Sequence, residues 1–178
     1  MNVFVAGVHG VGKTHLSSRI PASLGLTHTS ASKLIKEERA IPTWGTDKRV
    51  SDVEANQAAL STAVSRHNGA GFHLLLDGHF VLLDKEGDFQ PLEVEVFRAL
   101  NLNGVILLEA TPETIALRIQ DRDGRNADLS HIAGFLSAER TQAHKICDAL
   151  DIPLRILEQP SLETFAEEIK AILKPGVS

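Results

Sequence analysis

The chain has 178 residues, a hydrophobic fraction of 43% and a formal net charge of −5 at pH 7. This length fits one domain, expected over residues 1–175. The acidic balance argues against a broad nucleic-acid-binding surface, and no apolar run is long enough to span a membrane. No basic segment opens the chain, so no signal peptide is expected. Because Cys147 is the only cysteine, there is no internal disulfide, and a cytoplasmic location is the simplest expectation.

Short apolar strands and longer helical segments alternate along the chain. Strands are expected at residues 2–6, 27–29, 72–77, 105–109 and 154–157. Helices are expected at residues 13–24, 30–39, 51–68, 92–100, 111–120, 130–150 and 161–173. This alternation predicts right-handed β-α-β units and an α/β fold with a parallel sheet of five strands. Ligands in such folds bind at the carboxyl ends of the strands.

Three positions stand out between the regular elements. Pro21 lies inside the first predicted helix, where a proline ends or bends a helix. Trp44 lies in a predicted loop at residues 40–48, and it either packs on the core or closes over a substrate. Gly87 is expected at the centre of a polar turn or hairpin at residues 84–90.

The most specific motif follows the first predicted strand. Residues 7–14 read GVHGVGKT, the G-x-x-x-x-G-K-T pattern between a strand and a helix. The glycines let backbone N–H groups approach phosphate oxygens, and the next helix directs its positive end at the same oxygens. Lys13 would reach the β- and γ-phosphates, and the Thr14 hydroxyl would ligate Mg²⁺. The side chain of His9 occupies a variable position of this loop and is given no role.

An acid and a histidine follow the clearest buried strand. Asp77 ends the apolar run at residues 72–77, where a carboxylate can bind Mg²⁺ through water or simply end the strand in solvent. Burying an acid is costly unless it is used or paired, which favours the metal role. His79 would either contact an acceptor phosphate and move a proton, or hydrogen-bond at the strand end.

Two further groups of polar residues are candidates for phosphate contacts. A glycine-containing loop at residues 121–128 carries Arg122 and Arg125, and Arg118 lies on the helix before it. The loop could close over a triphosphate, or its arginines could pair with its own acids. The phosphate-binding loop (P-loop) at residues 7–14 favours closure of this second loop over a triphosphate. Arg140, on the following helix, either points back at the phosphates or extends into solvent. A helix start at Ser30, Ser32 and Lys33 could hold an acceptor phosphate, or it is plain helix capping.

Together these motifs resemble the small P-loop nucleoside-monophosphate kinases, closest to archaeal-type adenylate kinases and the related nuclear adenylate kinase. The resemblance is carried in order by residues 7–14, 76–79, 105–112 and 121–126. It implies a three-layer P-loop NTPase fold with a five-stranded parallel sheet of order 2-3-1-4-5, an acceptor-binding segment at about residues 30–68 and a lid at about residues 121–129. The sequence departs at residues 29–32, TSAS, where the family often has a Gly-Asp pair, and this leaves the acceptor open.

The resemblance also implies ATP with Mg²⁺ as donor, a nucleoside monophosphate as acceptor, and a set of site residues. The catalytic residues would be Lys13, Asp77, Arg122 and Arg125. The ATP contacts would come from Gly7, Val8, His9, Gly10, Val11, Gly12, Lys13, Thr14, His15, Arg122, Gln159 and Pro160, with adenine between Arg122 and the turn at Gln159. The acceptor would meet Ser30, Ser32, Lys33 and His79, and Mg²⁺ would meet Thr14 and Asp77.

Two other functions stay open at this stage. The acceptor could be a hydroxyl of a nucleoside or small metabolite, with Asp77 as general base. The chain could also be an ATP-hydrolysing switch or assembly factor that acts through a protein partner. The sequence leaves both a monomer and a homodimer open.

Overall fold

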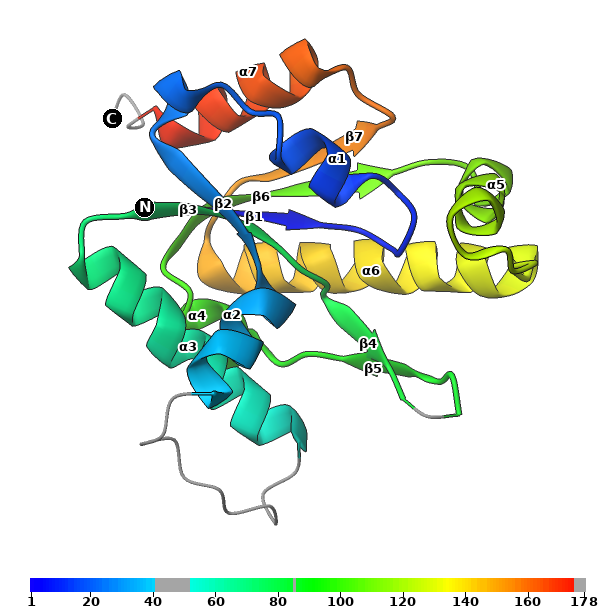
Figure 1. Cartoon of the computed structure of the whole chain (residues 1–178), viewed down its shortest axis with the longest axis horizontal. Helices are drawn as coiled ribbons and strands as arrows, with labels where there is room; N and C mark the ends of the chain where they lie inside the picture. The colour runs from blue at the N-terminus through cyan, green and yellow to red at the C-terminus, as the bar shows by residue number, and fades with distance from the viewer. Residues whose placement is uncertain (41–51, 85, 175–178) are drawn as a thin grey trace.

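A computed structural model of the chain describes residues 1–40, 52–84 and 86–174. Its central sheet is parallel and has the strand order β2-β3-β1-β6-β7 (Figure 1). These strands are β2 (Leu26–Ser30), β3 (His73–Asp77), β1 (Asn2–Ala6), β6 (Leu102–Glu109) and β7 (Leu154–Glu158). Counted among the strands of this sheet alone, the order is the expected 2-3-1-4-5. The labels β4 (Val81–Leu83) and β5 (Phe89–Pro91) belong to a separate antiparallel hairpin, which confirms the expected turn around Gly87.

Helices cover both faces of the sheet and confirm the α/β class. The long helix α6 (Leu129–Leu150) runs along one face, and α1 (Lys13–Ser17) and α7 (Leu162–Leu173) lie on the other (Figure 1). The remaining helices are α2 (Ala31–Arg39), α3 (Asp52–Gly69), α4 (Val94–Arg98) and α5 (Pro112–Asp123). Helix α2 packs on α3 near β2, and α4 and α5 both contact α6. None of the helices described is long and apolar enough to cross a membrane.

The core is packed against the middle of the sheet, directly beneath the strand ends. All five residues of β1 are buried, as expected for a parallel strand covered on both faces. The Phe4 ring meets Phe80 and Phe97 edge-on, with ring centroids 5.3 and 5.5 Å apart. A Cβ atom on Gly78 would lie 2.5 Å from the Phe4 ring, so this aromatic cluster requires glycine between Asp77 and His79.

Local capping signals in the sequence are realised at several helix starts. The hydroxyl of Ser30 accepts the N–H of Lys33 at 3.2 Å, and that of Thr111 accepts the N–H of Thr114 at 3.2 Å. Each of these hydrogen bonds satisfies a backbone donor that the first turn of a helix leaves unpaired. The Ser30 cap also places the start of α2 at the carboxyl end of β2, on the edge of the sheet where residues 7–14 follow β1.

Several predicted boundaries are wrong. The strand expected at residues 105–109 begins at Leu102, and the helix expected at residues 92–100 spans only Val94–Arg98. The first helix was expected at residues 13–24 but ends at Ser17, and a separate 3₁₀ turn, η1 (Ala22–Leu24), follows Pro21. Proline has no backbone N–H to continue the helix, and Pro21 is extended at φ −61° and ψ 136°. The loop expected at residues 121–128 is shorter, because α5 runs to Asp123 and ends at Gly124 with φ +66°. Trp44 and its predicted loop lie outside the described residues.

Candidate active site

The P-loop joins β1 to α1 at the carboxyl edge of the sheet. Gly7 has φ +140°, and a Cβ atom there would lie 2.5 Å from the carbonyl oxygen of Leu108 on the neighbouring strand. Gly12, at φ +112°, is the left-handed residue from which α1 begins. Only glycine combines this close approach with this backbone conformation. The loop therefore curls tightly enough to surround a phosphate with backbone N–H groups.

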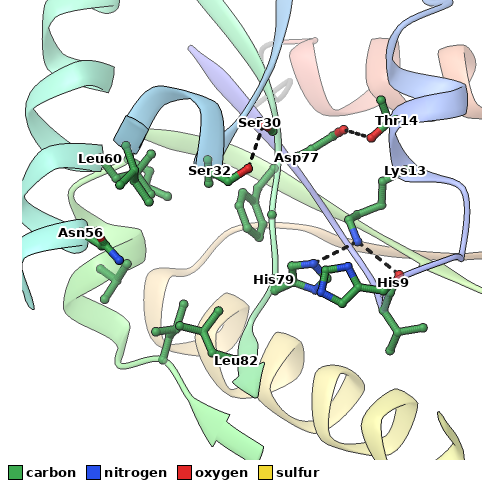
Figure 2. Close-up of a pocket in the computed structure, with 18 of the residues that line it drawn as sticks. His9, Lys13, Thr14, Ser30, Ser32, Asn56, Leu60, Asp77, His79 and Leu82 are labelled. Carbon is green, nitrogen blue, oxygen red and sulfur yellow. Dashed lines mark hydrogen bonds between the residues drawn. The ribbon is translucent and has the colours of Figure 1, made fainter. Parts of the chain in front are cut away.

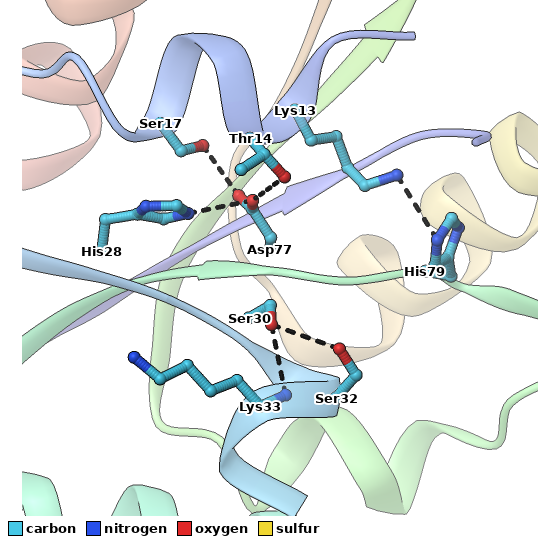
Figure 3. A network of polar contacts seen from close by, with 9 residues as sticks. All are labelled: Lys13, Thr14, Ser17, His28, Ser30, Ser32, Lys33, Asp77 and His79. Atoms are coloured by element: carbon cyan, nitrogen blue, oxygen red, sulfur yellow. Dashed lines mark hydrogen bonds and ion pairs between the residues drawn. The ribbon is translucent and has the colours of Figure 1, made fainter. Parts of the chain in front are cut away.

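Lys13 folds back into the loop from the start of α1. Its ammonium donates hydrogen bonds to the carbonyl oxygens of Gly7 and, at 3.2 Å, of Val8. It also lies 3.4 Å from Nε2 of His79 (Figure 3). Burial lowers the pKa of Lys13 to about 8, an effect that the nearby carboxylates of Glu139 and Asp77 oppose. Lys13 is thus a largely desolvated cation held beside the phosphate site.

Asp77 is the centre of a buried polar network at the end of β3. Its Oδ2 atom accepts the Thr14 hydroxyl at 3.2 Å and lies 2.9 Å from Nε2 of His28, while Oδ1 accepts the Ser17 hydroxyl at 2.7 Å (Figure 3). A threonine hydroxyl beside a carboxylate supplies the hard oxygen donors that Mg²⁺ prefers. The donor set therefore fits the expected metal, and Thr14 and Asp77 are the residues that would hold it.

Sequence reasoning missed Ser17 and His28. Ser17 lies one helical turn after Thr14, so an i, i+3 reading of the P-loop helix could have found it. His28 lies on β2, and its contact with Asp77 depends on β2 pairing with β3.

Two histidine rings line the phosphate site next to Lys13. The rings of His9 and His79 have centroids 4.4 Å apart, and His79 stacks on Phe135 at 6.1 Å. Burial is the main cause that lowers the pKa of His79, although Glu139 opposes it. The pKa of His9 falls to about 4, because its packed ring face is desolvated and His79 and Lys13 lie close. Both rings are neutral at pH 7.

A cavity of about 680 Å³ connects the P-loop with α2, α3 and α4 (Figure 2). Its polar lining includes several expected site residues: Lys13, Thr14, Ser30, Ser32, Asp77, His79 and Arg122. Its far end is largely apolar, with Phe4, Ile35, Leu60, Leu82 and Phe97 in the wall and Asn56 beside them. Lys33, expected to touch the acceptor, does not line this cavity. Its side chain is 65% exposed, and its ammonium lies 3.9 Å from Glu37.

A second cavity, of about 550 Å³, lies on the other side of the P-loop. It is lined by Gln159 and Pro160, and it shares Gly12, His15 and Arg118 with the first cavity. Arg118 donates to the Val11 carbonyl at 2.8 Å and lies 3.5 Å from Oε1 of Gln159. Arg118 therefore lies beside Gln159, whereas Arg122, which was expected to face this turn across an adenine, lines the first cavity.

The other arginines take different positions. Arg122 makes two hydrogen bonds to its neighbour Asp123, at 2.7 and 2.8 Å, although it still reaches the wall of the larger cavity. Arg125 is exposed and lines neither cavity. Arg140 pairs with Glu109, its Nε atom donating at 2.8 Å, and this contact turns it toward the end of β6. The structure therefore brings Lys13, Thr14, Asp77 and His79 together, while Arg125 and Lys33 stay apart from them.

Comparisons with known proteins agree with this geometry. The family described as "AAA domain" matches residues 6–134, which is more than half of the chain. A protein of Thermococcus onnurineus (strain NA1) named "Putative adenylate kinase" is 30% identical over 181 residues, covering 99% of this chain and 86% of the relative.

Solved structures show the same fold at low identity. A gluconokinase from Sinorhizobium meliloti 1021 aligns with a TM-score of 0.56 at 15% identity, over 97% of this chain and 90% of its own. A sugar kinase from Janibacter sp. HTCC2649 aligns with a TM-score of 0.56 at 21% identity, over 97% and 93%. The family match over more than half of the chain and the Thermococcus relative show that the chain belongs to the AAA domain family of P-loop kinases.

Proposed function

We propose that the chain transfers the γ-phosphoryl group of ATP to a nucleoside monophosphate, with Mg²⁺ as cofactor. One observation carries the proposal: a single cavity of about 680 Å³ has Lys13, Thr14 and Asp77 in its wall, with Ser30 and Ser32 beside them, and extends to an apolar end at Leu60 and Leu82. Such a volume is typical of small-molecule sites. The printed name of the Thermococcus relative supports the choice of acceptor.

At the donor end, the chain's own groups bind and neutralise the triphosphate. The backbone N–H groups of the P-loop hold the phosphate oxygens, and Lys13 exchanges its contacts with the Gly7 and Val8 carbonyls for phosphate oxygens. A bound Mg²⁺ would supply positive charge that offsets the charge developing on the phosphate oxygens. Thr14 and Asp77 would hold it, directly or through water. Arg118 and the turn at Gln159 would face the adenine in the second cavity.

At the acceptor end, apolar walls and a nearby basic group suit a nucleotide. A further cavity of about 560 Å³ adjoins the first, shares Ser32, Ile35 and Asn56 with it, and adds Lys36 and Arg39. The positive charge of these residues can attract an anionic acceptor into the site, while Leu60 and Phe97 in the larger cavity can pack on a base. The oxygen of a monophosphate is already nucleophilic, so catalysis needs chiefly positioning and electrostatic stabilisation. Arg122 and Arg125 would close over the transferring group.

A coupled assay with a panel of acceptors tests the proposal. The full-length protein, ATP and Mg²⁺ are incubated with each common nucleoside monophosphate, and ADP release is compared with the rate without acceptor. Gluconate and glucose belong in the panel, because two similar structures are titled gluconokinase and sugar kinase. Stimulation by at least one monophosphate is expected. A rate that no monophosphate raises above the acceptor-free value would exclude this function.

Transfer to a hydroxyl is the second candidate, favoured by those same two titles. A hydroxyl must lose a proton as it attacks, and Asp77 would accept that proton as general base. The variant Asp77→Asn separates the two functions at saturating Mg²⁺. A hydroxyl kinase should lose most of its rate, whereas a monophosphate kinase should recover much of it once the metal site is filled.

A further inference from the structure

Glu139 is a buried carboxylate on α6 whose main partners are backbone groups. Its side chain is 1% exposed. Its Oε1 atom accepts the N–H of Phe80 at 3.0 Å and that of Val81 at 3.2 Å. Among the residues described, no lysine or arginine forms an ion pair with it. Burying the charge of the Glu139 carboxylate without a cationic partner is costly. This cost indicates that Glu139 has a function near the phosphate site.

His79 lies between Glu139 and Lys13, and the hydrogen-bonding groups on its two sides determine the tautomer of its ring. The ammonium of Lys13 has only donors, and it lies 3.4 Å from Nε2 of His79, so Nε2 must present its lone pair. A neutral imidazole carries its single proton on the other nitrogen, Nδ1. That atom is buried, has no hydrogen bond of good geometry within the described residues, and lies 3.3 Å from Oε1 of Glu139. Glu139 is the acceptor within reach of the proton.

We propose that Glu139 is a positioning residue of the phosphate site, which holds His79 in its Nδ1-protonated tautomer so that Nε2 receives the Lys13 ammonium. The reverse tautomer would turn an N–H group toward the ammonium and displace Lys13 from the P-loop. By accepting the N–H groups of Phe80 and Val81, the same carboxylate anchors the backbone that carries His79. The inference rests on the proposed function only in taking Lys13 as a phosphate ligand.

The contact lies on a path from α6 to the P-loop. Glu139 comes from α6 on one face of the sheet, His79 follows β3, and Lys13 begins α1 on the other face. Figure 2 shows the Lys13 ammonium directed at the His79 ring, with the His9 ring beside it. The stacking of His79 on Phe135, one helical turn before Glu139, restrains rotation of the ring. Phe135 therefore restrains the ring while Glu139, beside Nδ1, leaves Nε2 facing Lys13.

Nitrogen-15 NMR of the histidine rings in the full chain tests this role without any need for turnover. The resonances of His79 are assigned by their loss in His79→Asn. In the wild type we expect a protonated-type signal at Nδ1 and an unprotonated-type signal at Nε2. Because Lys13 also favours this tautomer, the informative background is Lys13→Met. There Glu139 alone should keep Nδ1 protonated, and Glu139→Gln added to Lys13→Met should give mixed tautomers.

Glu38→Gln is the matched control, because Glu38 is another buried carboxylate, 5% exposed, that pairs with Arg66 far from His79. It should change the thermal midpoint without changing the His79 signals. Calorimetry with ATP and Mg²⁺ provides the second measurement: Glu139→Gln should weaken binding by about 10-fold, and Glu38→Gln by less than about 2-fold. Mixed tautomers in Lys13→Met with Glu139 intact would overturn the proposal, as would equal losses of affinity in the two glutamine variants. Failure of every acceptor in the kinase assay would leave both of these readouts unaffected.

Discussion

The hydroxyl of Thr14 donates to Oδ2 of Asp77 across 3.2 Å and so joins the first turn of α1 to the end of β3. The two residues are 63 positions apart in the sequence. They meet because β1 and β3 are hydrogen-bonded neighbours with Val5 opposite Asp77, so both strand ends reach the same edge. A pair of oxygen donors is thereby prepared beside the phosphate loop before any ligand binds.

Removing the charge of Lys13 should abolish most of the nucleotide affinity. Lys13→Met keeps the length of the side chain but loses the charge-assisted hydrogen bonds to phosphate, which are worth about 1.5–3 kcal/mol each. Binding of ATP with Mg²⁺, measured by calorimetry, should weaken by at least about 10-fold. Lys145→Met, on the exposed surface of α6, is the control and should bind as the wild type does. Unchanged affinity in Lys13→Met would contradict a phosphate role for this residue.

The affinity for ATP should fall as the pH rises through about 8. The pKa of Lys13 in the free protein is lowered to about 8, mainly by burial, and bound phosphate favours the protonated form. Above this pH the free protein must take up a proton to bind, so affinity should drop by about 10-fold per pH unit. Calorimetry between about pH 7 and 9 measures this slope. Lys13→Met should show no such dependence, and an equal slope in that variant would assign the proton to another group.

Asp77→Asn should raise the Mg²⁺ concentration that ATP binding needs. The amide nitrogen would replace either Oδ2, which accepts from Thr14 and His28, or Oδ1, which accepts from Ser17. In either case a buried N–H donor would face another donor. We expect the Mg²⁺ midpoint to rise by about 10-fold and stability to fall by about 1–3 kcal/mol. Ser17→Ala removes one hydrogen bond to the same carboxylate and should lower stability with little effect on Mg²⁺. Equal Mg²⁺ midpoints in wild type and Asp77→Asn would remove Asp77 from the metal site.

Arg118 and Arg125 should differ in function: Arg118 should bind ATP, and Arg125 should act on the phosphoryl group during transfer. Arg118 lines the cavity beside Gln159, so Arg118→Ala should raise the dissociation constant of ATP by about 10-fold. Arg125 is exposed and away from both cavities, so Arg125→Ala should leave that constant unchanged and lower kcat if the lid closes during transfer. Measuring binding and turnover for both variants tests the division. Loss of ATP affinity in Arg125→Ala alone would reverse it.

Gly78→Ala should destabilise the protein through the aromatic cluster under the site. The added Cβ would lie 2.5 Å from the Phe4 ring, which Phe80 and Phe97 hold in place. Overpacking of this kind costs about 1–3 kcal/mol and lowers the thermal midpoint by about 2–4 °C per kcal/mol. Gly69→Ala is the control, because a Cβ atom there meets nothing within 4 Å. Equal thermal midpoints for the two variants would show that the Phe4 ring moves aside freely.

Much of the fold could be predicted from local patterns in the sequence. The apolar runs of β1, β3 and β6 identify buried parallel strands, and Ser30 and Thr111 identify helix starts, because a cap requires only residues three positions apart. The end of α1 was not predictable in this way. Pro21 forbids helix at one point, but the chain leaves the helix earlier, at Ser17.

The P-loop, the acid that ends β3 and the parallel sheet can be read from the sequence, because each depends on neighbouring residues and on strand hydrophobicity. The folded structure was needed to show that Ser17 and His28, 60 and 49 positions from Asp77, complete its network. It likewise showed that Glu139 faces His79 and that Arg118 lies beside Gln159. Such contacts depend on strand order and on which helix face meets the sheet edge, and no short stretch of sequence encodes either.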